Sequence, residues 1–140
     1  AFEVGAKSIG LNITLPFEQE PNSFISPELC FEFKYFAIRK MHFLMRAKAM
    51  VAFPGGFGTM DELFETLTLI QTQRMDRFPL ILFGKDYWDR LINWDVFVEE
   101  GTISPQDLEL VSYAETAREA WDLIREFYRD KPAPILPRGQ

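Results

Sequence analysis

The stretch AMVAFPGG at residues 49–56 joins an unbroken apolar run to a sharp turn. Because the run has the length of a strand and no polar alternation, it predicts a strand that is buried on both faces. Residues 59–75 follow with apolar side chains at helical spacing. A second apolar run at 79–83, ending at Gly84, starts the same order again. Strands that alternate with helices in this way predict a parallel sheet.

Weaker patterns extend the prediction to the rest of the chain. We expect strands at 7–13, 30–36 and 108–113 and helices at 37–47 and 86–100. Thr116 and Glu119 have the spacing of a capping box and predict the start of a final helix. Gly5 stands where a helix-ending glycine would, so residues 1–4 are expected to be the tail of a helix.

These elements together predict a doubly wound, Rossmann-like α/β fold, with a parallel sheet and helices on both faces. We expect one nucleotide-binding domain at 1–130, with its N-terminal part missing, and a Pro-rich tail at 131–140. In such folds ligands bind beyond the carboxyl ends of the strands. The turn after residue 53 is therefore the expected place of a site.

Composition limits the classes of function. The 140 residues include 15 basic and 21 acidic side chains, and the net charge of −6 argues against a nucleic-acid partner. Cys30 is the only cysteine and His42 the only histidine, which excludes an internal disulfide and a Cys or multi-His metal site. No apolar run has membrane length, so we expect no membrane partner and a cytoplasmic location.

The glycines of the turn favour an anion site. Gly55, Gly56 and Gly58 permit positive φ and close backbone approach, so successive N–H groups can point at one phosphate. The dipole of the following helix adds a partial positive charge there. However, sharp strand-to-helix turns also use glycine for steric reasons alone, and the pattern by itself leaves both interpretations open.

Asp61 and Glu62 add carboxylates at the edge of this turn. One interpretation is structural: Thr59 and Glu62 form a capping box, and both acids are favoured by the start of a helix. The other is catalytic. A carboxylate held ionised by the helix suits a transition state that becomes cationic, such as the oxocarbenium ion formed when an N-glycosidic bond breaks.

Arg39 and Lys40 supply two adjacent cations upstream of the turn. Neighbours on a helix diverge by about 100°, so one could anchor a substrate while the other orients it. The alternative is an ordinary solvated face that includes Arg46 and Lys48.

The Arg39-Lys40 pair, with the turn of residues 54–62 starting fourteen residues after Lys40, resembles the LOG family of nucleoside-monophosphate phosphoribohydrolases. Members of this family were often labelled lysine decarboxylase-like. The resemblance implies a homodimeric hydrolase that needs no cofactor. Its substrate would be a cytokinin riboside 5′-monophosphate or AMP, cleaved at the N-glycosidic bond to free base and ribose 5-phosphate. The family normally has a strand and a further Gly-rich loop ahead of the first residues of this chain.

The resemblance also implies roles for individual residues. Arg39 and Glu62 match the catalytic residues. The substrate-binding candidates are Lys40, Gly55, Gly56, Gly58 and Thr59, with Asp61 beside the catalytic carboxylate and Thr68 on the following helix. Two other hypotheses remain open: a non-catalytic nucleotide or cofactor carrier of the same fold, and a structural subunit without a ligand. A carboxylate at an anion site favours the enzyme, because a carrier does not need one.

Overall fold

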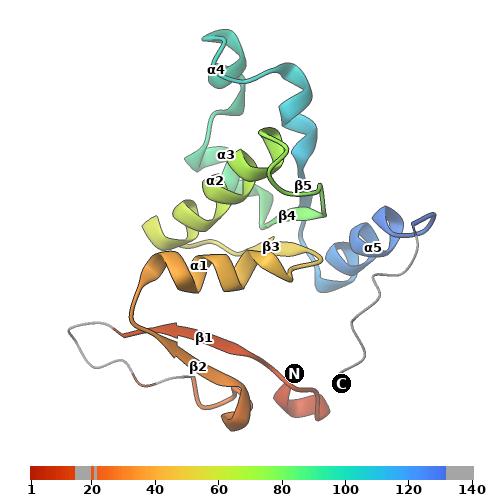
Figure 1. Cartoon of the computed structure of the whole chain (residues 1–140). Coiled ribbons are helices and arrows are strands. Elements are labelled where there is room, and N and C mark those ends of the chain that lie inside the picture. The colour runs from red at the N-terminus through yellow and green to blue at the C-terminus, as the bar shows by residue number, and fades with distance from the viewer. Residues whose placement is uncertain (15–19, 21, 132–140) are drawn as a thin grey trace. The chain divides into compact units, whose positions relative to one another are not determined.

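The computed structural model describes residues 1–14, 20 and 22–131 (Figure 1). The expected Pro-rich tail lies outside the described residues, apart from Lys131. The chain divides into two compact units, Ala1–Ala47 and Lys48–Gln140, and each is described by itself. Among the described residues, none of the helices combines the length and apolar character needed to cross a membrane.

The first unit holds a two-stranded parallel sheet. Strand β1 (Gly10–Ile13) pairs with β2 (Cys30–Phe33), and Gly10 lies opposite Cys30. The 3-10 turns η1 (Phe2–Val4) and η2 (Pro27–Leu29) precede the two strands, and helix α1 (Phe36–Met45) follows them. Gly5 ends η1 with a left-handed backbone (φ 67°), which confirms its role as a helix-ending residue.

The second unit holds a three-stranded parallel sheet in the order β3–β4–β5. Its strands are β3 (Met50–Ala52), β4 (Leu80–Phe83) and β5 (Val111–Ala114). Its helices are α2 (Phe57–Gln71), α3 (Lys85–Leu91), α4 (Trp94–Glu99), η3 (Pro105–Leu110) and α5 (Ala117–Phe127). Strands alternate with helices as the sequence indicated, and the α/β class with parallel strands is confirmed.

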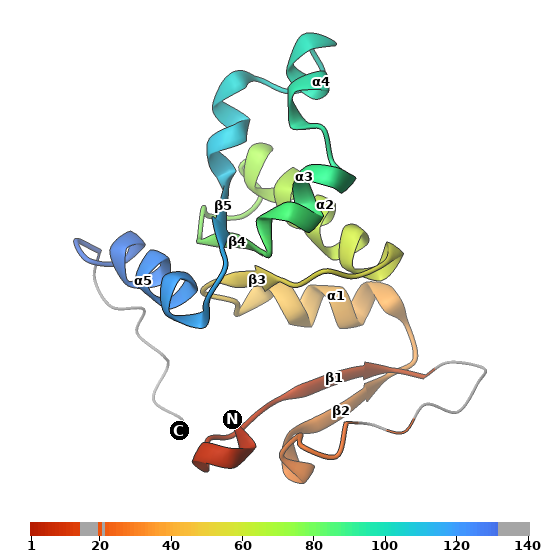
Figure 2. The same cartoon turned by 180° about the vertical axis from the view of Figure 1, so that it is seen from behind.

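The central strand β4 forms the core of this unit. Ile81 packs with Ala114 and with Ala120 of α5 on one face of the sheet. Leu80 and Leu82 are also buried, and their side chains point to the other face because successive residues of a strand alternate. Figures 1 and 2 show α2 and α5 on opposite sides of the three strands. Helices therefore cover both faces, as expected for a doubly wound sheet.

The ends of several predicted elements shift by a few residues, and two elements differ more strongly from the structure. The helix expected at 86–100 is broken into α3 and α4, because Ile92 leaves the helix with an extended backbone (φ −125°, ψ 119°) and is buried, 8% exposed. The strand expected from residue 108 begins only at Val111, after the 3-10 turn η3. The capping box of Thr116 and Glu119 is present and starts α5 as predicted.

Candidate active site

The turn at the carboxyl end of β3 places backbone N–H groups at the start of a helix. Helix α2 begins at Phe57, two residues earlier than expected, with Gly56 as its N-cap. The N–H groups of Thr59 and Met60 both donate to the Gly56 carbonyl oxygen, at 3.0 and 3.1 Å. The N–H groups of Phe57 and Gly58 precede these bonds at the positive end of the helix. They are therefore placed to donate to an anion.

The glycines of the turn differ in what they contribute. A Cβ on Gly55 would lie 2.2 Å from Thr59 Oγ1, whereas a Cβ on Gly56 or Gly58 would meet nothing within 4 Å. The glycines of this turn do not adopt the positive φ that the sequence allowed. Among the described glycines, positive φ occurs only at residues 5, 84 and 101. Close approach to Thr59, rather than a left-handed backbone, is what requires glycine at position 55.

We predict that Gly55→Ala destabilises the protein and that Gly58→Ala does not. The alanine methyl at 55 must displace the Thr59 side chain or the turn, and such overpacking costs about 1–3 kcal/mol. At 58, inside the first turn of α2, alanine has open space and a better helix propensity. Urea denaturation of both variants measures the difference. Equal stabilities would contradict the tight fit at Gly55.

Glu62 lies in the second turn of α2, beyond the helix cap. The capping-box interpretation of Thr59 and Glu62 is wrong, because the N-cap is Gly56 and no side chain caps this helix. Neither Asp61 nor Glu62 falls in the first turn, where capping acids act. Glu62 is half-buried and Asp61 is exposed. The position of Glu62 is therefore not explained by helix capping.

Thr68 lies on a different part of the surface of α2. It follows Glu62 by six residues, a rotation that leaves the two side chains about 120° apart around the helix. Its hydroxyl donates to the Phe64 carbonyl oxygen at 2.7 Å. Thr68 lines a pocket of about 100 Å³ formed by α2, α4 and the η3 region. The residues lining this pocket are Phe64, Leu67, Thr68, Gln71, Trp94, Phe97, Ile103, Asp107, Leu108, Leu110 and Val111.

One side of this pocket is polar. The Gln71 amide donates to Asp107 Oδ2 at 2.7 Å, and the Ser104 backbone N–H donates to the same oxygen at 2.8 Å. The hydrogen bond from Gln71, followed by the bond from the Ser104 backbone, lowers the pKa of Asp107. This carboxylate ties η3 to α2 and so helps to shape the pocket.

Arg39 and Lys40 lie on α1 in the first unit, and both are half-buried. The Arg39 Nε–H donates to the Leu11 carbonyl oxygen at 2.7 Å, which ties α1 to β1. Arg39 is therefore held by the fold of its unit rather than lying on a fully solvated face.

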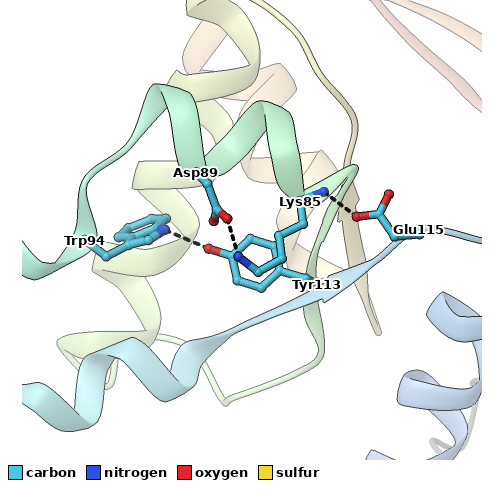
Figure 3. Close-up of polar contacts among 5 residues, drawn as sticks. All are labelled: Lys85, Asp89, Trp94, Tyr113 and Glu115. Atoms are coloured by element: carbon cyan, nitrogen blue, oxygen red, sulfur yellow. Dashed lines mark hydrogen bonds and ion pairs between the residues drawn. The ribbon is translucent and has the colours of Figure 1, made fainter.

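The carboxyl ends of β4 and β5 bring together polar side chains that the sequence analysis did not select (Figure 3). The Lys85 backbone N–H donates to Glu115 Oε1 at 2.8 Å, and the Lys85 ammonium pairs with Asp89. The hydrogen bond that the Lys85 ammonium donates to the Asp89 carboxylate raises the pKa of Lys85. Trp94 Nε1–H donates to the Tyr113 hydroxyl at 3.0 Å. For Lys85, Tyr113 and Glu115 the signal was their position at or just after the ends of β4 and β5, whereas Asp89 and Trp94 lie farther along the chain and gave no such signal.

Within residues 1–14, 20 and 22–131 the structure has no group of three or more His, Cys, Asp or Glu side chains that could hold a metal ion. The donors near the turn are instead backbone N–H groups, which suit an anion.

The structure defines an α/β protein with a Gly-rich turn between a strand and a helix, and comparison with known proteins identifies its family. The family described as possible lysine decarboxylase matches residues 1–124. The chain belongs to this family, and the predicted resemblance to the LOG proteins is confirmed.

Two plant relatives illustrate the similarity. A probable cytokinin riboside 5′-monophosphate phosphoribohydrolase of Oryza sativa subsp. japonica is 36% identical over 102 residues, which are 70% of this chain and 48% of that relative. A cytokinin riboside 5′-monophosphate phosphoribohydrolase of Arabidopsis thaliana is 37% identical over 91 residues, 64% of this chain and 42% of the relative. The chain thus spans about half the length of the curated relatives it matches.

Proposed function

We propose that the protein hydrolyses the N-glycosidic bond of a nucleoside 5′-monophosphate, either a cytokinin riboside 5′-monophosphate or AMP. The products are the free base and ribose 5-phosphate. The observation that carries this proposal is the start of α2, where backbone N–H groups at the positive helix end precede a half-buried carboxylate, Glu62, that does not cap the helix. The names of the plant relatives specify the same reaction.

In this proposal the turn holds the 5′-phosphate. The N–H groups of residues 56–58 donate to the phosphate oxygens, and the Thr59 side chain lies against Gly55 and supports the turn. Asp61 is exposed next to the catalytic carboxylate and contacts the substrate. The family resemblance assigns a catalytic role to Arg39 and a substrate-binding role to Lys40, and we carry both roles over as part of the proposal. The polar network of Lys85 at the same edge of the sheet borders the site.

Glu62 acts on the ribose. As the bond between C1′ and the base breaks, positive charge develops on C1′ and the ring oxygen, and an ionised carboxylate stabilises that charge. The same carboxylate orients the water that attacks C1′ and accepts its proton, while the base leaves with the electron pair of the broken bond and takes up a proton from solvent.

We further propose that the protein acts as a cytoplasmic homodimer.

Lys85, the lysine at this edge of the sheet, is poorly suited to form the Schiff base that a lysine-dependent decarboxylase reaction needs. Such a lysine must lose its proton to act as a nucleophile. The hydrogen bond from the Lys85 ammonium to Asp89 raises the pKa of Lys85 and so favours the protonated form.

The test of the function is release of free base, measured by chromatography. We expect adenine from AMP and the corresponding base from a cytokinin riboside 5′-monophosphate. Adenosine should react at least about tenfold more slowly, because it lacks the group that the charge-assisted hydrogen bonds of the turn recognise. Absence of base release from every monophosphate would contradict the proposal, as would equal rates with AMP and adenosine.

A further inference from the structure

Tyr87 of α3 holds the peptide group at the centre of the turn. Its hydroxyl donates to the Gly55 carbonyl oxygen at 2.6 Å, across 32 residues of sequence. The carbonyl of Gly55 and the N–H of Gly56 belong to one planar trans peptide, in which the two groups point in opposite directions. Fixing the carbonyl toward Tyr87 therefore directs the Gly56 N–H away from α3. A Cβ on Gly56 would meet nothing within 4 Å, so the region around this residue is open.

The position of Tyr87 is itself fixed by the core. The next residue, Trp88, is fully buried, and its Nε1–H donates to the Phe83 carbonyl oxygen at 3.0 Å. The Tyr87 ring packs edge-on against the Trp88 ring, with the centroids 5.2 Å apart. The Tyr87 backbone N–H donates to Gly84, whose own N–H bonds to Ala114 of β5. The hydroxyl is thus presented to the turn by a rigid support and not by a mobile side chain.

The other side of the turn is closed by α2. Thr59 of α2 lies against the Cα of Gly55, and Tyr87 of α3 holds the Gly55 carbonyl oxygen. The peptide between Gly55 and Gly56 is therefore restricted on both sides. If the hydrogen bond served stability alone, the direction of the Gly56 N–H would be of no consequence. At a phosphate site it matters, because a donor that is already oriented does not have to be ordered when the ligand binds.

We propose that Tyr87 is a positioning residue for the phosphate of the substrate: it orients the Gly55–Gly56 peptide so that the Gly56 N–H donates to a phosphate oxygen. This inference rests on the proposed function for the identity of the turn as the phosphate site. It concerns recognition of the 5′-phosphate and not the breaking of the N-glycosidic bond.

The test compares Tyr87→Phe with Tyr128→Phe. The first change removes the hydroxyl and keeps the ring that packs on Trp88. The second removes a bond of the same kind, from Tyr128 to the Lys48 carbonyl oxygen at 2.7 Å, just before the opposite end of β3. Titration calorimetry measures the Kd for AMP and for ribose 5-phosphate, and steady-state kinetics measures kcat and KM for AMP and adenosine.

For Tyr87→Phe we expect the Kd for both phosphates and the KM for AMP to rise about five- to tenfold, the size of one weakened charge-assisted hydrogen bond. The kcat should stay within about twofold, because the step at C1′ is not touched. The preference for AMP over adenosine should fall by the same factor as the KM rises. Tyr128→Phe should leave all of these values unchanged.

Two results would overturn the inference. In the first, Tyr87→Phe lowers only the melting temperature and leaves the Kd for AMP and the preference over adenosine as in the wild type, which is the behaviour of a purely structural bond. In the second, the wild-type protein binds neither phosphate. Binding of AMP without release of adenine would refute the proposed reaction instead, and the Kd of Tyr87→Phe would still decide the role of Tyr87.

Discussion

Replacing Glu62 with Gln is expected to lower the kcat for release of adenine from AMP by at least about 10²-fold, the usual effect of removing one group that stabilises transition-state charge. Glutamine keeps the size of the side chain and one acceptor oxygen, but it replaces the other oxygen with an NH2 group and removes the negative charge that stabilises the cation on the ribose. The Kd for AMP should change by less than about threefold, because the bound nucleotide carries no such cation. A kcat measured by chromatography and a Kd measured by calorimetry separate the two effects.

Glu99→Gln provides the matched control. Glu99 is an exposed residue at the end of α4, so the substitution makes the same change of net charge on a part of the surface that is not proposed to bind substrate. We expect wild-type kcat and KM from this variant. A Glu62→Gln variant that retained most of its activity would exclude the role given to Glu62. A loss in both variants would point to net charge rather than to the position of one carboxylate.

The parallel sheet could be predicted from the sequence because its signal is local. The runs at 49–53 and 79–83 lack polar alternation, and each corresponds to a strand that contributes fully buried or nearly buried residues. The break between α3 and α4 could not be predicted in the same way. The apolar spacing continues through residue 92, and only packing in the folded unit favours an extended Ile92 over one more turn of helix.

The start of α2 lies three residues before the start that the Thr59–Glu62 capping-box spacing indicated. Thr59 and Glu62 have the spacing of a capping box, yet Gly56 becomes the N-cap and Phe57 starts the helix. Thr59 instead lies within the helix, and its side chain packs against Gly55. The interpretation of Glu62 as a capping residue failed for this reason. Its catalytic role stays a prediction, as do the roles of Arg39 and Lys40.

The residues that the sequence analysis missed depend on contacts between distant segments. The bond from Tyr87 to Gly55 and that from Lys85 to Glu115 each join residues about 30 positions apart. Neither residue stands in a motif that indicates such a contact. The rule that ligands bind at the carboxyl ends of parallel strands could have drawn attention to residues 84–87 and 113–115. It could not have identified the partner of each side chain.

Replacing Trp88 with Ala is expected to cost about 3–5 kcal/mol of stability, the usual loss for a large aromatic side chain truncated in a core. Trp88 is 0% exposed and lies on α3, directly after the central strand β4. Its removal leaves a cavity and also leaves the Phe83 carbonyl oxygen without the indole N–H that donates to it. Urea denaturation followed by circular dichroism measures the loss without depending on tryptophan fluorescence.

Trp121→Ala is the control for this change. Trp121 lies on α5 and is 54% exposed, so its truncation should cost less than about 1 kcal/mol. Similar losses in the two variants would contradict the role of Trp88 as the anchor of α3. If Trp88 is that anchor, Trp88→Ala should also weaken AMP binding at urea concentrations where the protein remains folded, because Tyr87 loses the ring against which it packs. The stability of the core and the orientation of the phosphate-binding peptide would then depend on the same two neighbouring residues.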